Sequence, residues 1–600
     1  MRFLAVPLLM VPLLMVSWIA PPAYANTPPT DFSYIVRFEG LDQTTAVAEA
    51  ITDSSTLVAQ ARTPPPTRAA LRRRANQDIE RMIAAARSFG YYDAAVDVAI
   101  EPPVDSGPST VVVTATTGQV YAVADVAVHA MTGDSSAVGL ELPRADIPLK
   151  PGDPAVAAPV LDAETVLVRL VRERGYPLAK AGERKVVIDR AAKTMMVTYT
   201  IDSGPRARFG PVRVVGSETV DPTYILRRLP WRYGQDADVR QLEKGRRALT
   251  ATGVFDTVTV TFDDAVDGDG LLPVQVTVVE RDRRTIGAGV SASTSEGLGA
   301  TAFWTHRNLF GGAERFDFRA DLAEVKSGVS GQLRLPDIIR NDQDLVLHSG
   351  YVEKNTDSFD SETYSVGGYF DWRLSRILSV DYGAVLERSE VDEDGVSSQF
   401  TLVGIPLGVT LDTADDLLNP TKGGRTRLRF TPYLETLGST QAMYQLSVQH
   451  AHYLALDSAG DMVLAGRARW GAIIGSSTTN LPADKRFYSG GSGSVRGYAF
   501  QHVGPLDAGN EPLGGRSVIE VSAELRWRVW GDVGIVPFID AGQVYNTETP
   551  SLDEELQWGA GLGVRYFTPV GPVRADLGFP LNGRDSDDTF QVYFSLGQAF

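Results

Sequence analysis

The segment IEVSAELRWRV, residues 519–529, changes character at every second position. Ile519 and Val521 are apolar, whereas Glu520 and Glu524 are charged. Successive side chains of a strand point to opposite faces, so a period of two predicts a strand with one apolar and one polar face. Such a strand suits a sheet that lies between lipid and a wet lumen.

The same alternation fills the second half of the chain. From residue 285 onward, about sixteen strand-length segments follow one another, separated by turns rich in glycine, asparagine and aspartate. Alternation by itself also fits a soluble sandwich. An even number of strands with loops of uneven length favours a closed outer-membrane barrel. We therefore expect a transmembrane antiparallel β-barrel over residues 284–600.

The start of the chain has the three parts of a secretory signal peptide, residues 1–25. Arg2 supplies the positive charge, residues 3–20 are mostly apolar, and Ala23 and Ala25 form the small-x-small cleavage pattern. The alternative is a membrane anchor, which the prolines within the apolar stretch disfavour. We therefore expect export, with cleavage after Ala25.

The composition excludes several classes of function. The chain has no cysteine, so disulfides, thiol nucleophiles and thiolate metal sites are absent. Its formal net charge of -17 argues against nucleic acid as a partner, since phosphate binding needs clustered lysine and arginine. No nucleophile elbow, phosphate-binding loop or zinc-protease motif occurs. We expect neither an enzyme nor a cofactor.

Two groups of residues suggest metal binding only weakly. His450 and His452 share a face of one strand, but a metal site there lacks a third ligand that the sequence can name. Asp264, Asp267 and Asp269 lie in an acidic stretch whose spacing is incomplete for a calcium loop. An acidic hairpin turn is the favoured interpretation, and no metal site is expected.

Between the signal peptide and the barrel, the pattern is a diverged repeat of helices and strands. Each copy has a basic amphipathic helix, then a glycine, then a strand, and the three glycines are Gly90, Gly175 and Gly253. Proline-rich stretches separate the copies. This repeat predicts three α+β modules of the order β-α-α-β-β. We place them at residues 26–118, 119–205 and 206–283.

Two further motifs resemble a known family. The block RFYSGGSGSVRGY, residues 486–498, resembles the signature loop of the Omp85 superfamily, and FIDAG, residues 538–542, resembles its barrel-wall motif. In that family the loop folds back into the barrel, and its arginine meets an acidic residue of the wall. An arginine in a partly dehydrated lumen needs such a carboxylate to offset its desolvation. The resemblance implies the site residues Arg496, Gly497, Tyr498, Asp540 and Gly542. An ordinary surface turn is the alternative for the loop.

The three modules resemble the polypeptide-transport-associated (POTRA) modules of the same superfamily. The likeness rests on the helix, glycine and strand junctions at the three glycines. Within the superfamily, three modules resemble the TamA branch, whereas BamA typically has more and two-partner secretion transporters fewer. The resemblance implies a bacterial outer-membrane protein whose modules lie in the periplasm.

The resemblance also implies a weak lateral seam between the first and last barrel strands. Its residues would be Gly287, Gly289, Gly597 and Phe600. Glycine adds no packing within a strand, so it weakens a seam or only curves the sheet, and both interpretations stay open. Alternation through the last segment, FQVYFSLGQAF, places Phe600 on the lipid side.

The partners follow from the same resemblance. They are client β-barrel proteins such as autotransporters, outer-membrane lipid, and a TamB-like periplasmic protein that is anchored in the inner membrane and docks on the first module. The expected function is insertion of clients through the seam. Two alternatives remain: a pore that exports one dedicated substrate, and a component of phospholipid transport to the outer membrane.

Overall fold

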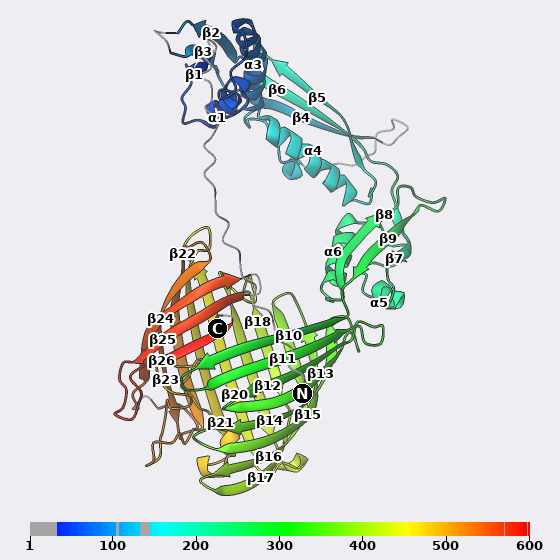
Figure 1. Cartoon of the computed structure of the whole chain (residues 1–600). Coiled ribbons are helices and arrows are strands. Elements are labelled where there is room, and N and C mark those ends of the chain that lie inside the picture. Colours follow the sequence, from blue (N-terminus) through cyan, green and yellow to red (C-terminus); the bar gives the residue numbers. More distant parts are fainter. Residues whose placement is uncertain (1–32, 104–106, 132–143, 552, 569–570, 597) are drawn as a thin grey trace, which may run out of the picture. The chain divides into compact units, whose positions relative to one another are not determined.

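The computed structural model describes most of the chain. It consists of three small mixed modules followed by a closed β-barrel (Figure 1). The predicted signal peptide, with Ala23 and Ala25, lies outside the described residues, and so does Gly597. The described residues are 33–103, 107–131, 144–551, 553–568, 571–596 and 598–600.

The first module is a three-stranded sheet with helices packed against it. Its strand order is β1-β3-β2, with β1 parallel and β2 antiparallel to β3. The long helix α3 buries Leu71, Met82 and Ala86, which share one face because they recur at helical spacing. The elements are β1 (Tyr34–Glu39), α1 (Ala46–Asp53), α2 (Thr56–Ala59), α3 (Arg68–Ser88), β2 (Ala95–Glu101) and β3 (Ser109–Thr116).

The second and third modules repeat this strand order, as β4-β6-β5 and β7-β9-β8. Gly90, Gly175 and Gly253 follow the main helices with φ angles of 90°, 93° and 73°, a region that favours glycine. The elements are β4 (Ala122–Met131), the 3-10 helix η1 (Arg144–Asp146), α4 (Ala157–Arg172), β5 (Lys180–Asp189), β6 (Thr194–Asp202), β7 (Arg208–Val215), α5 (Pro222–Arg227), α6 (Val239–Thr250), β8 (Phe255–Phe262) and β9 (Leu271–Glu280).

The second module departs from the expected order of two α-helices. Its described residues hold one α-helix, α4, and the short η1 in place of the other. The stretch around η1 is rich in proline, including Pro148 and Pro151. Proline lacks the N–H that a helix interior needs, which accounts for the short helix.

The wall of the barrel contains the strands β10 to β26, seventeen in number. Both β17 and β18 pair with β16 and with β19, so they are two halves of one wall strand. Pro406 lies between the halves and has no N–H to donate to the ladder. The wall thus has sixteen strands, 17 less 1, and all neighbours are antiparallel, as the alternation predicted.

The bounds of the wall strands are as follows. They are β10 (Arg284–Ser293), β11 (Gly297–Arg307), β12 (Arg315–Ala323), β13 (Lys326–Leu335), β14 (Gln343–Asn355), β15 (Asp360–Arg373), β16 (Leu378–Glu393), β17 (Val396–Gly404), β18 (Leu407–Asp412), β19 (Gly423–Tyr433), β20 (Met443–Ala455), β21 (Met462–Ile474), β22 (Ser517–Trp530), β23 (Val533–Tyr545), β24 (Gln557–Thr568), β25 (Gly571–Pro580) and β26 (Gln591–Leu596). Short 3-10 helices are η2 (Glu435–Leu437), η3 (Thr478–Asn480) and η4 (Ala483–Lys485).

Side chains of the wall alternate between the lumen and the outer face. In β22, Glu520 and Glu524 are each 1% exposed, whereas Val521 and Trp527 are 38% and 44% exposed. Outward apolar side chains suit contact with hydrocarbon, and inward charged ones suit a wet or ion-paired lumen. Among the described residues, no helix has the length and apolar character needed to cross a membrane.

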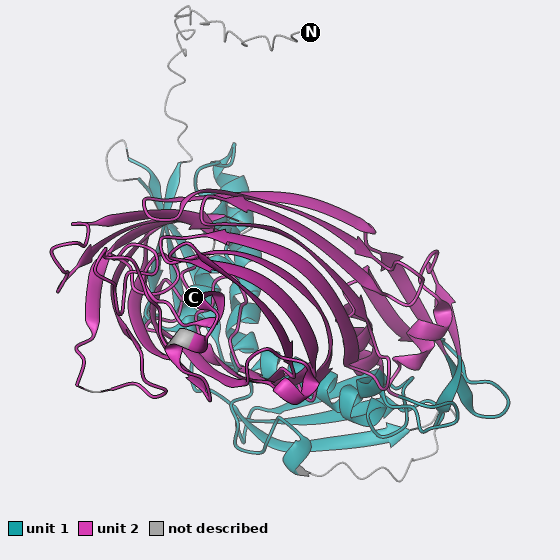
Figure 2. Cartoon of the chain, turned by 90° about the horizontal axis from the view of Figure 1, so that it is seen from below, with its two compact units in different colours: residues 1–211, 231–241, 262–273 teal, residues 212–230, 242–261, 274–600 magenta. Residues whose placement is uncertain are grey.

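The chain divides into two compact units (Figure 2). The barrel shares its unit with residues 212–230 and 242–261 of the third module. Within this unit, Arg228 is buried at the end of α5 and forms ion pairs with Asp337 and Asp342. Both aspartates lie in the turn between β13 and β14, so these ion pairs fix the end of α5 on that turn.

Candidate functional site

The loop between β21 and β22 turns back against the inside of the wall. Its two arms are joined by backbone bridges, Phe487 with Gly515 and Ser489 with Val503. The tip of the loop, residues 490–498, contacts side chains of β21, β22, β23, β25 and β26. One of the two largest side chains that are almost fully buried among the described residues belongs to this tip.

That side chain is Arg496, which is 1% exposed and pairs with Asp540 of β23. Nε of the arginine lies 2.7 Å from Oδ2 of the aspartate, and Nη2 lies 3.0 Å from Oδ1. The backbone N–H of Arg496 also donates to Oδ2, at 3.1 Å. Arg496 and Asp540, the pair that the resemblance implied, therefore form a bidentate ion pair. This is the arrangement in which arginine binds a carboxylate most specifically.

The sequence did not reveal the other partners of Arg496. Nη1 donates to Glu524 of β22 at 2.7 Å and to Asp576 of β25 at 3.4 Å. The guanidinium also lies 3.6 Å from the centre of the Phe538 ring. Alternation placed Glu524 on the inner face, but neither alternation nor the motif says which inner residues face one another across the lumen. That depends on strand register and on the path of the loop.

Further arginines complete a buried ionic network. Arg526 donates to the second oxygen of Glu524 at 3.0 Å, and Arg565 forms an ion pair with Asp576. Arg574 lies 3.7 Å from the same aspartate. Buried charges are stable only when they are paired and hydrogen-bonded, so every wall strand from β22 to β25 depends on the network.

Glycines let the backbone of the loop lie close to the wall. Gly497 has a φ angle of 104°, and a Cβ there would lie 2.7 Å from the carbonyl carbon of Phe579. At Gly542 of β23, a Cβ would lie 2.8 Å from Val495 of the loop. Both predicted glycines thus occupy points of contact between loop and wall, where a larger residue would force the two apart.

Tyr498, the last residue of the motif, is fully buried. Its hydroxyl lies 3.1 Å from the backbone oxygen of Trp558 and 3.1 Å from Oδ1 of Asn582. A buried tyrosine hydroxyl needs such partners to offset its desolvation. The whole predicted set of loop and wall residues is therefore gathered in one place.

The wall closes where β26 meets β10, and this junction is short. β10 pairs with β11 along its whole length of ten residues. It forms two residue pairs with β26, at Ala292 and Ser293, whose partners are Phe594 and Tyr593. On that side, residues 284–291 have no strand partner among the described residues. The seam expected from the resemblance coincides with this short junction.

The two described seam glycines differ in their surroundings. A Cβ at Gly287 would lie 2.1 Å from the ring of Phe303, its register partner on β11, so this glycine makes room for an aromatic ring. At Gly289 nothing lies within 4 Å of such an atom. Gly287 therefore serves packing against Phe303, whereas the space beside Gly289 is open.

The position of Phe600 differs from the one expected from the sequence. Alternation placed it on the lipid side, but β26 ends at Leu596 and the ring lies inside the barrel. It packs against Tyr453, and the guanidinium groups of Arg467 and Arg526 lie 5.6 and 5.2 Å from its centre. The prediction was wrong because a period of two fixes the direction of a side chain only while the strand continues.

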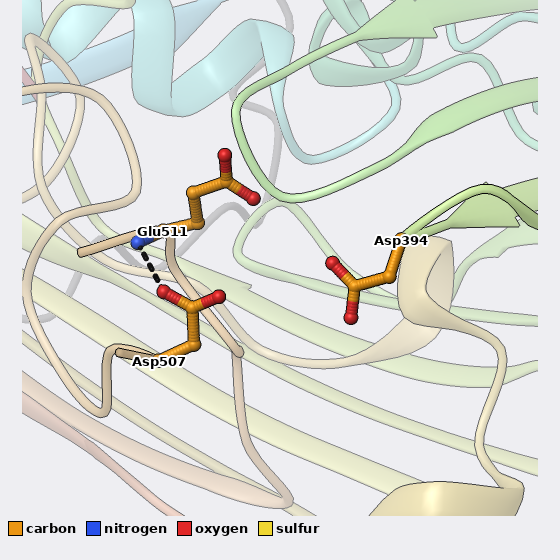
Figure 3. Close-up of side chains that lie close together, drawn as sticks. All are labelled: Asp394, Asp507 and Glu511. Atoms are coloured by element: carbon orange, nitrogen blue, oxygen red, sulfur yellow. Dashed lines mark hydrogen bonds between the residues drawn. The ribbon is translucent and has the colours of Figure 1, made fainter. Parts of the chain in front are cut away.

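One group of acidic side chains and one pair of histidines bear on the question of metal binding. The carboxylate oxygens of Asp394, Asp507 and Glu511 lie within 4.8 Å of one another (Figure 3), but two of these residues are exposed. Asp507 accepts the backbone N–H of Glu511 at 2.8 Å, so it serves to shape its own turn. His450 stacks on His452, and its Nδ1 lies 2.9 Å from the Thr426 hydroxyl.

The acidic stretch between β8 and β9 is likewise a turn. Asp267 accepts the backbone N–H groups of Asp269 and Leu271 at 3.0 and 2.8 Å. This is the hairpin interpretation that the sequence favoured.

Comparison with known proteins identifies a family model and several relatives that resemble this chain. Residues 308–600 match the Omp85 superfamily domain. The barrel of this chain belongs to the Omp85 superfamily. Outer membrane protein assembly factor BamA of Nitratidesulfovibrio vulgaris is 27% identical over 436 residues, which cover 67% of this chain and 53% of that protein. The chain thus spans about half the length of that relative.

Two further proteins extend the likeness toward the modules. BamA of Neisseria meningitidis serogroup B is 22% identical over 591 residues, covering 87% of this chain and 72% of that protein. The structure of BamA from Haemophilus ducreyi lacking POTRA domains 1-3 has the same fold, with a TM-score of 0.66 at 17% identity, over 79% of this chain and 99% of that one. The expected location is confirmed: this Omp85 barrel lies in the bacterial outer membrane, with its POTRA-like modules in the periplasm.

Proposed function

We propose that this protein inserts client β-barrel proteins, autotransporters among them, into the outer membrane through the seam between β10 and β26. The observation that carries the proposal is the short junction, which leaves residues 284–291 of β10 without a second strand partner among the residues that the structure describes. Unpaired backbone donors and acceptors at a sheet edge are a template for an incoming strand. Such pairing needs no catalyst and no energy source.

The outer face of β10 supports the same function. Ile286 and Val290 are 82% and 81% exposed, so the unpaired edge carries apolar side chains on its outer face. A client strand added there would keep its own apolar row in contact with hydrocarbon. The relatives named as outer-membrane assembly factors agree with this proposal.

The experiment is a reversible lock of the seam. The chain has no cysteine, so Ala292→Cys combined with Phe594→Cys gives a single disulfide between register partners. The oxidised protein, reconstituted in liposomes, should lose insertion of an unfolded client barrel, scored by heat-modifiable gel migration. Reduction should restore the insertion. The single variant Ala292→Cys is the matched control.

The same lock separates insertion from export by a dedicated pore. A substrate that crosses through the lumen does not need the seam, so its export would be insensitive to oxidation. Unchanged client insertion by the oxidised double variant would overturn the proposal.

We further propose that a TamB-like periplasmic protein docks on the first module. This step rests on the resemblance of the three modules and on the exposed basic side chains of α3, Arg72 and Arg73. Site-specific photo-crosslinking from α3 in cells that encode such a protein tests it. No crosslink from any exposed position of α3 would contradict the proposal.

A further inference from the structure

The seam by itself has little to keep it closed. Beyond its two residue pairs, it gains three hydrogen bonds among the described residues, one of them from the Thr294 hydroxyl to the Gln591 side chain. The backbone N–H of Thr294 donates to the carbonyl of Val592 at 3.0 Å, and the N–H of Val592 donates to the Thr294 hydroxyl at 3.1 Å. Each such hydrogen bond replaces one with water and adds little net stability, so a seam closed by these contacts alone would open readily.

The tip of the luminal loop contacts the first-strand side of this seam. Glu296 lies in the turn that joins β10 to β11. Its Oε1 accepts hydrogen bonds from both the backbone N–H and the hydroxyl of Ser492, at 3.0 and 2.7 Å. A carboxylate that accepts two hydrogen bonds makes a charge-assisted contact, the stronger kind.

The same loop also contacts the last-strand side. Tyr593 of β26 is 1% exposed, and its hydroxyl accepts the N–H of Gly497 at 3.2 Å. That hydroxyl donates in turn to the carbonyl of Tyr498 at 3.1 Å. A buried hydroxyl that both accepts and donates is fully satisfied, so it holds the loop backbone against β26.

Arg574 of β25 strengthens this second attachment. Its Nε donates to the hydroxyl of Ser595 on β26 at 2.5 Å, and its Nη2 donates to the carbonyl of Ser492 at 3.3 Å. One guanidinium thus joins the last strand to the loop residue that binds Glu296.

The loop between the two attachments is also held by side chains of β21 and β23. Arg467 of β21 donates to the carbonyls of Gly493 and Ser494 at 2.6 and 3.3 Å. Arg496 is fixed by Asp540, as described above. Residues 492–498 are therefore positioned as one piece, and a shift at one end is transmitted to the other.

We propose that this loop segment is a clasp across the seam, closed on one side by Glu296 and on the other by Tyr593. The two residues lie on opposite sides of the junction, so β10 cannot move away from β26 without breaking one of them. Glu296 and Tyr593 are positioning residues that act on the seam through the loop. The clasp adds to the proposed function a contact that controls the seam. Its structural part stands by itself, and only its role in client insertion rests on the proposed function.

The test is amide hydrogen exchange of the seam in the full chain, folded in detergent or lipid. Exchange there reports how often the junction opens. Glu296→Ala removes both hydrogen bonds to Ser492 and should speed exchange at residues 290–294 and 591–595 by on the order of tenfold. Glu296→Gln keeps an acceptor oxygen and should stay within about twofold of the wild type.

A matched control comes from another carboxylate of the wall. Glu390 accepts hydrogen bonds from Ser397 and Gln399 at 3.1 and 3.2 Å, on strands far from the seam in the wall order. Glu390→Ala should leave exchange at the seam unchanged. Heat-modifiable migration checks that every variant folds.

A clasp also predicts how two variants combine. Tyr593→Phe removes the bridging hydroxyl and keeps the ring, so it should weaken the second attachment, which Arg574 still supports. Attachments in series fail when either one breaks, so Glu296→Ala with Tyr593→Phe should exchange no faster than the faster single variant. Fold-changes that multiply would mean two independent contacts and would overturn the clasp, as would unchanged exchange in Glu296→Ala.

Client insertion is scored in the same variants and distinguishes the two proposals. Faster seam exchange with unchanged client insertion in every variant, the seam lock included, keeps the clasp and removes the proposed function. Unchanged exchange in Glu296→Ala, together with loss of insertion in the seam lock, removes the clasp and keeps the proposed function.

Discussion

The barrel wall has two regions that are built in opposite ways. From β22 to β25, neighbouring strands pair over about their full length, with eleven residue pairs between β22 and β23. Arg496 ties these strands together through Asp540, Glu524 and Asp576. At the seam, β10 and β26 share two residue pairs. The loop is thus anchored on the fully paired strands and also contacts the seam, where few residue pairs join the first and last strands.

The largest expected effect comes from removing the anchor. Arg496→Ala leaves Asp540 buried without its cation and Glu524 with Arg526 alone, a cost of about 3–5 kcal/mol. We expect a lower urea midpoint of heat-modifiable migration and a loop that proteases cut. The exposed Arg388 is the control: Arg388→Ala should change stability by no more than about 0.5 kcal/mol.

Exchanging the two charges sharpens this prediction. Arg496→Asp combined with Asp540→Arg keeps the pair but presents Glu524 with a carboxylate in place of the guanidinium. Because three carboxylates surround the arginine, the swap should restore only part of the stability. Full recovery would mean that the pair acts alone, and that the network around it adds nothing.

The second prediction compares the two regions within the wild-type chain. Amides of β22 and β23 should exchange at least about a hundredfold more slowly than amides at residues 290–294, because opening of the fully paired region requires breaking the ionic network. Mass spectrometry of exchanged peptides measures both regions in one sample. Equal protection would contradict the description of the seam as weak.

The third prediction uses two glycines of the same strand. Gly287→Ala places a methyl group against the ring of Phe303, and overpacking of this kind costs about 1–3 kcal/mol. Gly289→Ala meets open space and should cost less than about 0.5 kcal/mol. Urea midpoints of the two variants measure the difference. Equal effects would show that packing against Phe303 does not explain why position 287 is glycine.

The smallest effect concerns a pH-dependent contact outside both regions. Burial raises the pKa of Glu280 in the third module, but hydrogen bonds from the Thr219 hydroxyl and from backbone N–H groups lower it more, so the pKa lies below its ordinary value. A depressed carboxyl pKa adds stability above the unfolded pKa of about 4.3, and this stability is lost as the pH falls through the folded value.

Hydrogen exchange at residues 217–221, corrected for intrinsic rates, measures this contact. Protection should be higher at about pH 7 than at about pH 3, and Glu280→Gln should remove most of the difference. The seam and the anchor should not respond to this variant. Altered hydrogen exchange at the seam in Glu280→Gln would show that this contact of the third module is coupled to the seam.

Much of the fold followed from local patterns. The period of two in segments such as residues 519–529 predicted the strands and their lipid-facing rows, because lipid on one side and the lumen on the other impose alternation on every strand. The three glycines after helices marked the modules, since the left-handed backbone there favours glycine. The pairing of Arg496 with Asp540 came from the resemblance of two motifs and not from any local pattern.

The sequence alone thus determined the barrel, the modules and the first pair of the site. Tertiary structure alone decided which inner side chains meet: Glu524 and Asp576 at the arginine, and Glu296 and Tyr593 at the seam. It also turned Phe600 inward. The physical reason is that alternation fixes the face of each residue, whereas contacts across the lumen depend on strand register, on where a strand ends and on the path of the loop.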